Sequence, residues 1–141
     1  MSTDSRKHLL FVCIENSNRS QMAQAFAIML GGDRVSAHSA GSRPSGKVNP
    51  KAIEAMRELG YDLAAHQSKS LTEIPDVAYA AAITMGCGDA CPHVKATLHE
   101  DWQIPDPRNM EPAEFRKVRD LIREKVRDLL NRVNQSGVGP R

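Results

Sequence analysis

The sequence predicts a single α/β domain built on a four-stranded parallel sheet with helices on both faces. Apolar runs typical of strands alternate with amphipathic segments typical of helices, and this alternation favours right-handed crossovers and a parallel sheet. The chain has 141 residues, of which 40% are hydrophobic, and this suits one compact core. We expect the domain to span residues 1–134 and residues 135–141 to form a flexible tail.

The first predicted strand is the continuous apolar run HLLFVC at residues 8–13, which fits a strand buried on both faces. Directly after it, apolar residues recur at steps of three and four over residues 19–30 and predict a helix. The Gly31-Gly32 pair ends that pattern. The chain therefore opens with a strand, a loop and a helix.

Residues 35–40 predict a second strand, which the turn-rich stretch GSRPSGKVN follows. Asn49 is a favoured helix cap and Pro50 a favoured first helical residue, so we expect a helix to begin here and to end at Gly60. A short third helical segment then precedes Pro75, which breaks it.

The stretch AYAAAITM, residues 78–85, predicts a third strand, and a weaker fourth strand is expected around residues 94–98. The last helix is expected to begin at Glu111, with Pro112 in its first turn. Apolar residues spaced three or four apart between Phe115 and Val133 indicate that one side of this helix is packed.

Composition and charge exclude several classes of protein. The 19 basic and 17 acidic residues are spread along the chain and give a net charge of +2, so nucleic acid is not an expected partner. The first apolar run is too short for a signal sequence or a membrane span. We expect a soluble, intracellular protein.

The three cysteines are Cys13, Cys87 and Cys91. In a reducing compartment such cysteines are reactive thiols or metal ligands rather than structural disulfides. Cys13 and Cys87 each follow a predicted strand, and ligands of parallel sheets bind beyond the carboxyl ends of the strands. We therefore expect these two thiols to meet at a ligand site.

The stretch VCIENSNRSQM places a cysteine and an arginine six positions apart between the first strand and the first helix. Loop amides and a helix amino terminus can cradle a tetrahedral oxyanion there, and Arg19 adds a planar fork of donors. The positive electrostatic field of these donors also stabilises a thiolate, so Cys13 is the expected nucleophile. The other expected residues of this oxyanion-binding loop are Ile14, Glu15, Asn16, Ser17, Asn18 and Ser20.

The segment CIENSNRSQMAQAF resembles the anion-binding loop of the low-molecular-weight protein tyrosine phosphatase fold. At position 21 this chain has glutamine, which resembles the arsenate reductases built on this fold, because they have the sequence RSQMAE. The phosphatases usually have proline at this position. The resemblance continues through SAGSRPSG, NPKAIEAMRELGYDL, TMGCGDACP, IPDP and EFRKVRDLI. It implies a low-molecular-weight tyrosine phosphatase-like fold and a thioredoxin-coupled reduction of arsenate, with phosphate and sulfate as competing oxyanions. On this reading we expect a cytoplasmic monomer that uses no bound redox cofactor.

By this resemblance, Cys13 attacks the oxyanion, Arg19 and the loop amides bind it, Asn16 stiffens the loop and Ser20 donates a hydrogen bond to the thiolate. Asp106, in the segment DPR, matches the general acid of the family. A carboxyl group held beside an oxyanion is also suited chemically to protonate a leaving oxygen.

The resemblance further implies a cascade of three thiols. Cys87 attacks the arsenylated Cys13, arsenite leaves, and Cys91 then resolves the Cys13–Cys87 disulfide to Cys87–Cys91 by thiolate exchange. His66 stands where many reductases of this family carry a histidine, and it is a candidate support of the loop.

Other functions stay open at this point. A phosphatase acting on phosphotyrosine or small phosphomonoesters needs only Cys13 and the acid, although aromatic residues make up only 4% of the chain and Arg108 stands where the phosphatases usually have tyrosine. A noncatalytic oxyanion-binding or zinc-binding module is a further alternative, with Cys87, Cys91 and His93 as the zinc ligands, but no convincing fourth ligand follows. Mycothiol or glutaredoxin could replace thioredoxin as the reductant. Glu15 stands where the family often has glycine, and its carboxylate would repel a bound anion.

Overall fold

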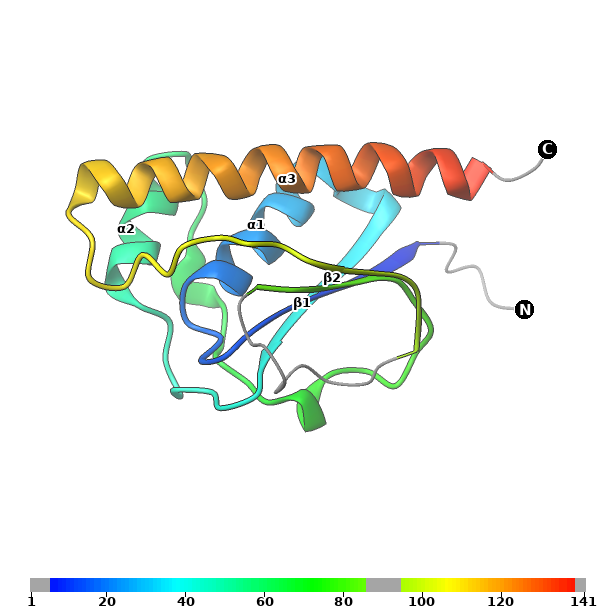
Figure 1. The fold of residues 1–141 in the computed structure, drawn as a ribbon, viewed down its shortest axis with the longest axis horizontal. Coiled ribbons are helices and arrows are strands. Elements are labelled where there is room, and N and C mark those ends of the chain that lie inside the picture. Colours follow the sequence, from blue (N-terminus) through cyan, green and yellow to red (C-terminus); the bar gives the residue numbers. More distant parts are fainter. Residues whose placement is uncertain (1–5, 86–94, 139–141) are drawn as a thin grey trace.

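The computed structural model describes residues 6–85 and 95–138 of the chain. Its four strands are β1 (Lys7–Cys13), β2 (Val35–Gly41), β3 (Tyr79–Thr84) and β4 (Ala96–Asp101). They form one parallel sheet in the order β2-β1-β3-β4, so β1 has a neighbour on each side (Figure 1). The four-stranded parallel sheet predicted from the sequence is confirmed.

The central strand β1 sets the register of the sheet. Its residues from Leu9 to Val12 are completely buried, as the continuous apolar run predicts. Cys13 lies opposite Gly41 at the end of β2, and Val12 lies opposite Thr84 at the end of β3. The carboxyl ends of three strands therefore meet at one edge of the sheet, beside Cys13.

The fourth strand lies further along the chain than residues 94–98. It runs from Ala96 to Asp101 at the edge of the sheet, and half-buried and exposed residues alternate along it. Such an edge strand carries a weaker apolar signal than a strand buried on both faces, which explains the shifted boundary.

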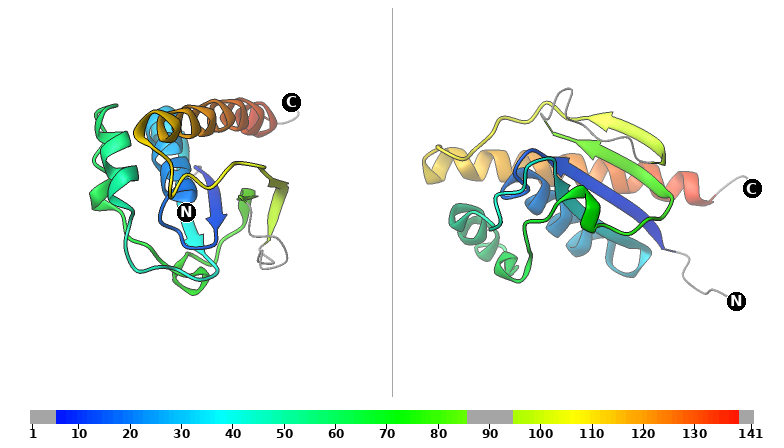
Figure 2. Two further views of the ribbon diagram at one scale, coloured as in Figure 1. Left: turned by 60° about the vertical axis from the view of Figure 1, so that its left-hand side comes forward. Right: turned by 90° about the horizontal axis from the view of Figure 1, so that it is seen from below.

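The three α-helices all pack on one face of the sheet (Figure 2). They are α1 (Arg19–Gly31), α2 (Pro50–Arg57) and α3 (Pro112–Val138). Phe11 of β1 shares one core with Met22 and Phe26 of α1, Met56 of α2 and Ile122 of α3. The side chains at alternate positions of β1 thus contact helices that are far apart in the sequence.

The opposite face of β1 has a thinner helical cover. Leu10 and Val12 form a second cluster with Tyr79, and Leu71 and Ile74 pack against it. The 3-10 helix η3 (Leu71–Glu73), which a Ser70 capping box begins, belongs to this cover. The predicted helices on both faces are confirmed. On this second face, the described residues form a single 3-10 turn and no α-helix.

Two helix ends differ from the predicted boundaries. α2 ends at Arg57, and hydrogen-bonded turns carry the chain to Gly60, whose φ of 85° stops any continuation. α3 continues to Val138, beyond position 134, where we expected the domain to end. Within the described ranges, no helix is long and apolar enough to cross a membrane.

Candidate active site

The loop from Cys13 to Ser20, called the anion loop below, joins the end of β1 to the start of α1. Asn16 adopts a φ of 52°, a left-handed conformation that asparagine tolerates better than most residues. Asn18 precedes α1, and its side chain makes no capping bond to the first turn. An anion in this loop would meet the positive end of the helix dipole.

The Cys13 thiol lies at the bottom of the loop with only 3% of the residue exposed. Its Sγ is 2.9 Å from Oγ of Ser20. Asn16 Nδ2 donates to the same Oγ at 2.8 Å, which leaves the serine hydroxyl hydrogen free to point at the sulfur. Ser20 is therefore placed to donate a hydrogen bond that favours the thiolate.

The Asn16 side chain is itself held by donors from outside the loop. Its Oδ1 accepts from the backbone N–H of Lys69 at 2.8 Å and from Nε2 of Gln21 at 2.9 Å. Because both groups donate to this oxygen, the Asn16 amide must turn its NH₂ toward Ser20. The amide orientation thus follows from the network around it.

Gln21 connects the loop to a histidine and a tyrosine. Its Oε1 lies 2.9 Å from Nδ1 of His66, and Nε2 of His66 lies 2.6 Å from the hydroxyl of Tyr61. Since an amide oxygen only accepts, His66 carries its proton on Nδ1 and accepts from Tyr61 at Nε2. Burial, reinforced by the positive charge of Lys69, lowers the pKa of His66 from 6.5 to about 4, so the ring is neutral at pH 7.

Together these contacts form one directional series of hydrogen bonds, called the relay below. It runs from Tyr61 through His66, Gln21, Asn16 and Ser20 to the Cys13 sulfur. Each member donates toward the thiol, so each polarises the next in the same sense. The relay thus directs a hydrogen-bond donor at the sulfur through neutral groups alone.

Arg19 begins α1 and extends its guanidinium to the same site. Its NH1 group donates to the carbonyl of Ile104 at 3.0 Å, and the residue is 9% exposed. Its NH2 group lies 3.9 Å from Oδ2 of Asp106, which is partly exposed. The arginine fork and the carboxyl group therefore reach one space from different segments of the chain.

That space is a small cavity of about 90 Å³. Among the described residues, eight line it: Cys13, Ile14, Glu15, Ser17, Asn18, Arg19, Asp106 and Arg108. Oδ1 of Asn18 is buried without a hydrogen-bond partner among the described residues, and as an acceptor it could bind only a protonated oxygen of a ligand. The cavity combines a nucleophile, a carboxyl group and a guanidinium, which are the functional groups needed for attack on a tetrahedral oxyanion.

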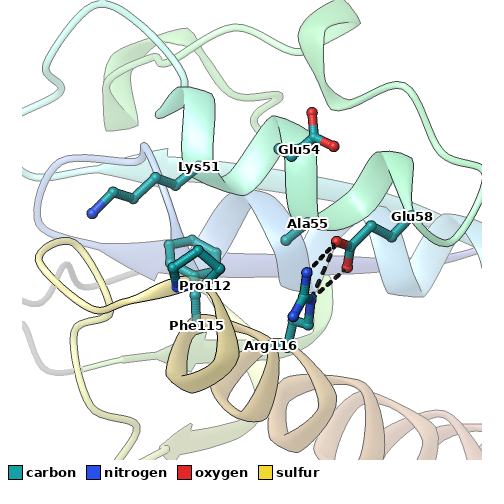
Figure 3. Close-up of a pocket in the computed structure, with 7 residues that line it drawn as sticks. All are labelled: Lys51, Glu54, Ala55, Glu58, Pro112, Phe115 and Arg116. Atoms are coloured by element: carbon teal, nitrogen blue, oxygen red, sulfur yellow. Dashed lines mark hydrogen bonds and ion pairs between the residues drawn. The ribbon is translucent and has the colours of Figure 1, made fainter.

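A larger pocket of about 260 Å³ lies between α2 and α3 (Figure 3). Glu58 and Arg116 form an ion pair at its edge, and Glu58 also binds the buried Arg119. Phe115 forms part of its apolar wall. The Glu58 carboxylate is already bound by two arginines, and no thiol is among the described residues that line the pocket, so the smaller cavity is the candidate active site.

The structure brings together the predicted loop residues, Arg19, Asp106 and His66. Cys87, Cys91 and the candidate zinc ligand His93 lie outside the described residues. Sequence reasoning did not assign Tyr61 to the site. The spacing of five residues between Tyr61 and His66 is the only signal for it, and this spacing is uninformative without the fold.

Comparison with known proteins gives a consistent assignment. The low molecular weight phosphotyrosine protein phosphatase family matches residues 8–138. Arsenate reductase 1 of Staphylococcus epidermidis is 37% identical, over 91% of this chain and 98% of that protein. The glutaredoxin arsenate reductase of Synechocystis is 36% identical, over 91% of this chain and 99% of that protein.

Solved structures agree with this. An arsenate reductase in the phosphate-binding state superposes with a TM-score of 0.82 and 36% identity, over 90% of this chain and 98% of the other. The thioredoxin-dependent arsenate reductase of Corynebacterium glutamicum gives a TM-score of 0.79 and 28% identity, over 96% of this chain and 65% of the other. This chain therefore belongs to the low molecular weight phosphotyrosine protein phosphatase family, in which it resembles arsenate reductases across nearly its whole length.

Proposed function

We propose that this protein reduces arsenate to arsenite through Cys13, Cys87 and Cys91, and that thioredoxin returns the resulting disulfide to the thiol state. The observation that carries the proposal is the buried Cys13 thiol, 2.9 Å from Ser20 Oγ, in a cavity that Arg19 and Asp106 also line. The arsenate reductases at 36–37% identity support the same reaction.

In the first step the Cys13 thiolate attacks arsenic and forms a sulfur–arsenic bond. Arg19 and the anion loop hold the arsenate oxygens, and one arsenic–oxygen bond breaks. Asp106, whose Oδ2 is 3.9 Å from the Arg19 guanidinium, supplies the proton with which that oxygen leaves as water. The arsenic remains in the +5 state, because this step exchanges ligands and transfers no electrons.

In the second step the Cys87 thiolate attacks the Cys13 sulfur. The sulfur–arsenic bond breaks with its electron pair on arsenic, which falls to the +3 state and leaves as arsenite. The Cys91 thiolate then attacks Cys87 in the Cys13–Cys87 disulfide and releases the Cys13 thiolate. Thioredoxin reduces the remaining Cys87–Cys91 disulfide by a further exchange, so the two electrons come from its dithiol.

The disulfide pattern tests this sequence of steps. Reduced protein is treated with arsenate, free thiols are blocked, and the disulfides are mapped by mass spectrometry. We expect Cys87–Cys91 in the wild type and Cys13–Cys87 in the Cys91→Ser variant. Thioredoxin, its reductase and NADPH should then support continuous NADPH oxidation on addition of arsenate. Protein that keeps all three thiols free after arsenate treatment would contradict the proposal.

The glutaredoxin-named relative supports a different reductant, so the same assay is run with glutaredoxin and glutathione. Thioredoxin is favoured here because the Cys87–Cys91 pair forms the disulfide that the thioredoxin dithiol reduces. Since such reductants operate in a reducing compartment, we place the reaction in the cytoplasm, and we propose that the protein acts as a monomer.

Phosphatase activity is the second candidate, because the family assignment and the arrangement of Cys13, Arg19 and Asp106 also suit attack on a phosphate ester. A phosphatase needs neither Cys87 nor Cys91. Hydrolysis of an aryl phosphate that survives Cys87→Ser and Cys91→Ser, but not Cys13→Ser, would demonstrate it, and arsenate-dependent NADPH oxidation would separate the two activities.

A further inference from the structure

An ion pair joins two partly exposed residues that line the active-site cavity. Arg108 NH1 lies 2.7 Å from Oε2 of Glu15, and both residues line the cavity that holds Cys13. The two side chains are 52% and 40% exposed, whereas Cys13 is 3% exposed. The thiol therefore lies at the closed end of the cavity, and the ion pair lies at its solvent side.

The Glu15 end of this pair is fixed by backbone contacts. The Glu15 carbonyl oxygen accepts from the Ser68 hydroxyl at 3.0 Å and from the backbone N–H of Ser45 at 3.0 Å. The neighbouring Ile14 carbonyl accepts from the Arg43 N–H at 2.8 Å. These donors hold this part of the anion loop in place, so the carboxylate extends from a fixed base.

The Arg108 end is fixed as well. Lys51 Nζ donates to the carbonyl oxygens of Arg108 and Met110, at 3.1 and 3.2 Å. The Arg108 N–H donates to Oδ1 of Asp106 at 3.1 Å. The ion pair thus joins two anchored segments, the anion loop and the loop that carries the proposed general acid.

Charge explains why the two residues occur together. A lone Glu15 carboxylate beside an oxyanion would repel it, while a paired Glu15 contributes no net charge to the mouth.

The size of the cavity gives the second argument. The cavity is about 90 Å³, whereas a cavity on the order of 150 Å³ is known to hold one benzene ring. The space therefore suits a tetrahedral anion, and an aryl group attached to that anion would have to extend out of the cavity past Glu15 and Arg108.

We propose that the Glu15–Arg108 ion pair determines substrate class, by admitting free inorganic oxyanions to Cys13 and excluding organic monoesters of phosphate or arsenate. This inference rests on the proposed function, since it assumes that Cys13 meets an oxyanion. It assigns a role to Glu15, which otherwise opposes anion binding, and to Arg108. Both residues act by closing the mouth and balancing its charge, and neither takes part in bond making.

Protection of Cys13 from alkylation tests the inference without any turnover. A Cys87→Ser/Cys91→Ser parent leaves Cys13 as the single thiol, and its rate of reaction with iodoacetamide is measured against increasing phosphate or phenylphosphonate. The double substitution Glu15→Ala/Arg108→Ala opens the mouth and keeps its net charge. We expect it to raise phenylphosphonate affinity relative to phosphate affinity by roughly tenfold, a usual scale for discrimination by pocket shape.

The single substitution Arg108→Ala tests the effect of charge on anion affinity separately from the effect of mouth size. It leaves Glu15 unpaired, so we expect protection by both anions to weaken by roughly tenfold, as one partly screened like charge would cause. Adding Glu15→Ala to it should restore part of that loss. The matched control is Glu54→Ala/Arg57→Ala, which removes an exposed ion pair from α2 and should leave both affinities as in the parent.

The outcomes are distinct. If the phenylphosphonate-to-phosphate ratio of the Glu15→Ala/Arg108→Ala variant equals that of the parent, the inference is overturned. If phosphate fails to protect Cys13 in the parent, both the oxyanion site and the inference fail. If phosphate protects but the wild type gives no arsenate-dependent NADPH oxidation, the proposed reductase function fails, while the measured ratio still decides the role of the ion pair.

Discussion

At the scale of single residues, neutral side chains surround the Cys13 sulfur on the protein side. Ser20 is completely buried and contacts the thiol, and Asn16 and Gln21 behind it are also completely buried. Buried polar groups of this kind are costly unless every bond is made. The relay provides these hydrogen bonds, and His66 and Tyr61 complete the relay near the surface.

The contact between Ser20 and Cys13 leads to the first prediction. Ser20→Ala removes the hydrogen bond to the thiolate, and such bonds to charged groups contribute about 1.5–3 kcal/mol. In the single-thiol Cys87→Ser/Cys91→Ser parent, we expect iodoacetamide to alkylate Cys13 about tenfold more slowly at pH 7. Ser36→Ala, distant from the thiol, is the control. An unchanged rate for Ser20→Ala would show that Ser20 does not stabilise the thiolate.

The second prediction concerns pH and His66. Its pKa of about 4 lies below the unfolded value of 6.5, so the unfolded chain binds more protons between these pH values. The free energy of unfolding should therefore rise with pH from about 4 to 6.5. The part of it that neutral His66 contributes is lost as pH falls through that window. His38, with a pKa also lowered to about 4 by burial, contributes in the same direction.

Urea denaturation at pH 4.5, 5.5, 6.5 and 7.5 checks this. His66→Gln keeps a polar side chain in the relay and removes the titrating group, so the rise of unfolding free energy with pH should become shallower, with the remainder due largely to His38. A slope identical to that of the wild type would mean that His66 is not the titrating group. His38→Gln in the same assay separates the two contributions.

At the scale of elements, the end of β2 packs against the anion loop. A Cβ atom on Gly41 would lie 2.6 Å from the Ile14 carbonyl oxygen and 3.0 Å from Asn16. The Gly41 N–H also donates to the Lys69 carbonyl at 2.9 Å, so the strand cannot easily move away. Close approach of two backbones thus requires glycine here.

The third prediction follows from this packing. Gly41→Ala should lower the free energy of unfolding by about 1–3 kcal/mol, the usual cost of an overpacked site. It should also weaken phosphate protection of Cys13, because the loop must shift to admit the methyl group. Ser36→Ala on the same strand serves as the control for stability. Wild-type stability and wild-type protection in Gly41→Ala would show that the loop accommodates the Cβ atom freely.

At the scale of the whole molecule, the cavity draws its walls from the anion loop and from the segment that carries Asp106 and Arg108, before α3. An oxyanion that binds only the folded protein must therefore stabilise the entire domain. The gain depends on the ligand concentration, and it reaches about 2.7 kcal/mol at 100 times the dissociation constant.

The fourth prediction uses this linkage. Sulfate should raise the unfolding temperature of the wild type more than sodium chloride at equal ionic strength, which controls for screening. Arg19→Lys should lose most of the sulfate-specific increment, because an ammonium group cannot reproduce the guanidinium fork. The increment is the readout, since the variant also loses the contact with the Ile104 carbonyl and will be less stable without ligand. Equal increments in both proteins would contradict oxyanion binding by Arg19.

Much of this architecture could be predicted because it depends on local patterns. The buried strand before Cys13, the helix after Arg19 and the Asn49 cap are each encoded within a few neighbouring residues, and the structure confirms them. The edge strand β4 was harder to predict, since only alternate residues along it are partly buried. The short helical segment predicted before Pro75 is the 3-10 helix η3, but its single turn is too short for periodicity to show which face of the sheet it covers.

By itself, then, the sequence determined the sheet, its main helices and a loop in which a thiol and a guanidinium are six positions apart. Only the tertiary structure decided what surrounds them. Gln21 meets His66 across 45 positions, and Glu15 meets Arg108 across 93. Periodicity reports burial within one element, whereas such pairs form only when the sheet brings distant loops to one edge.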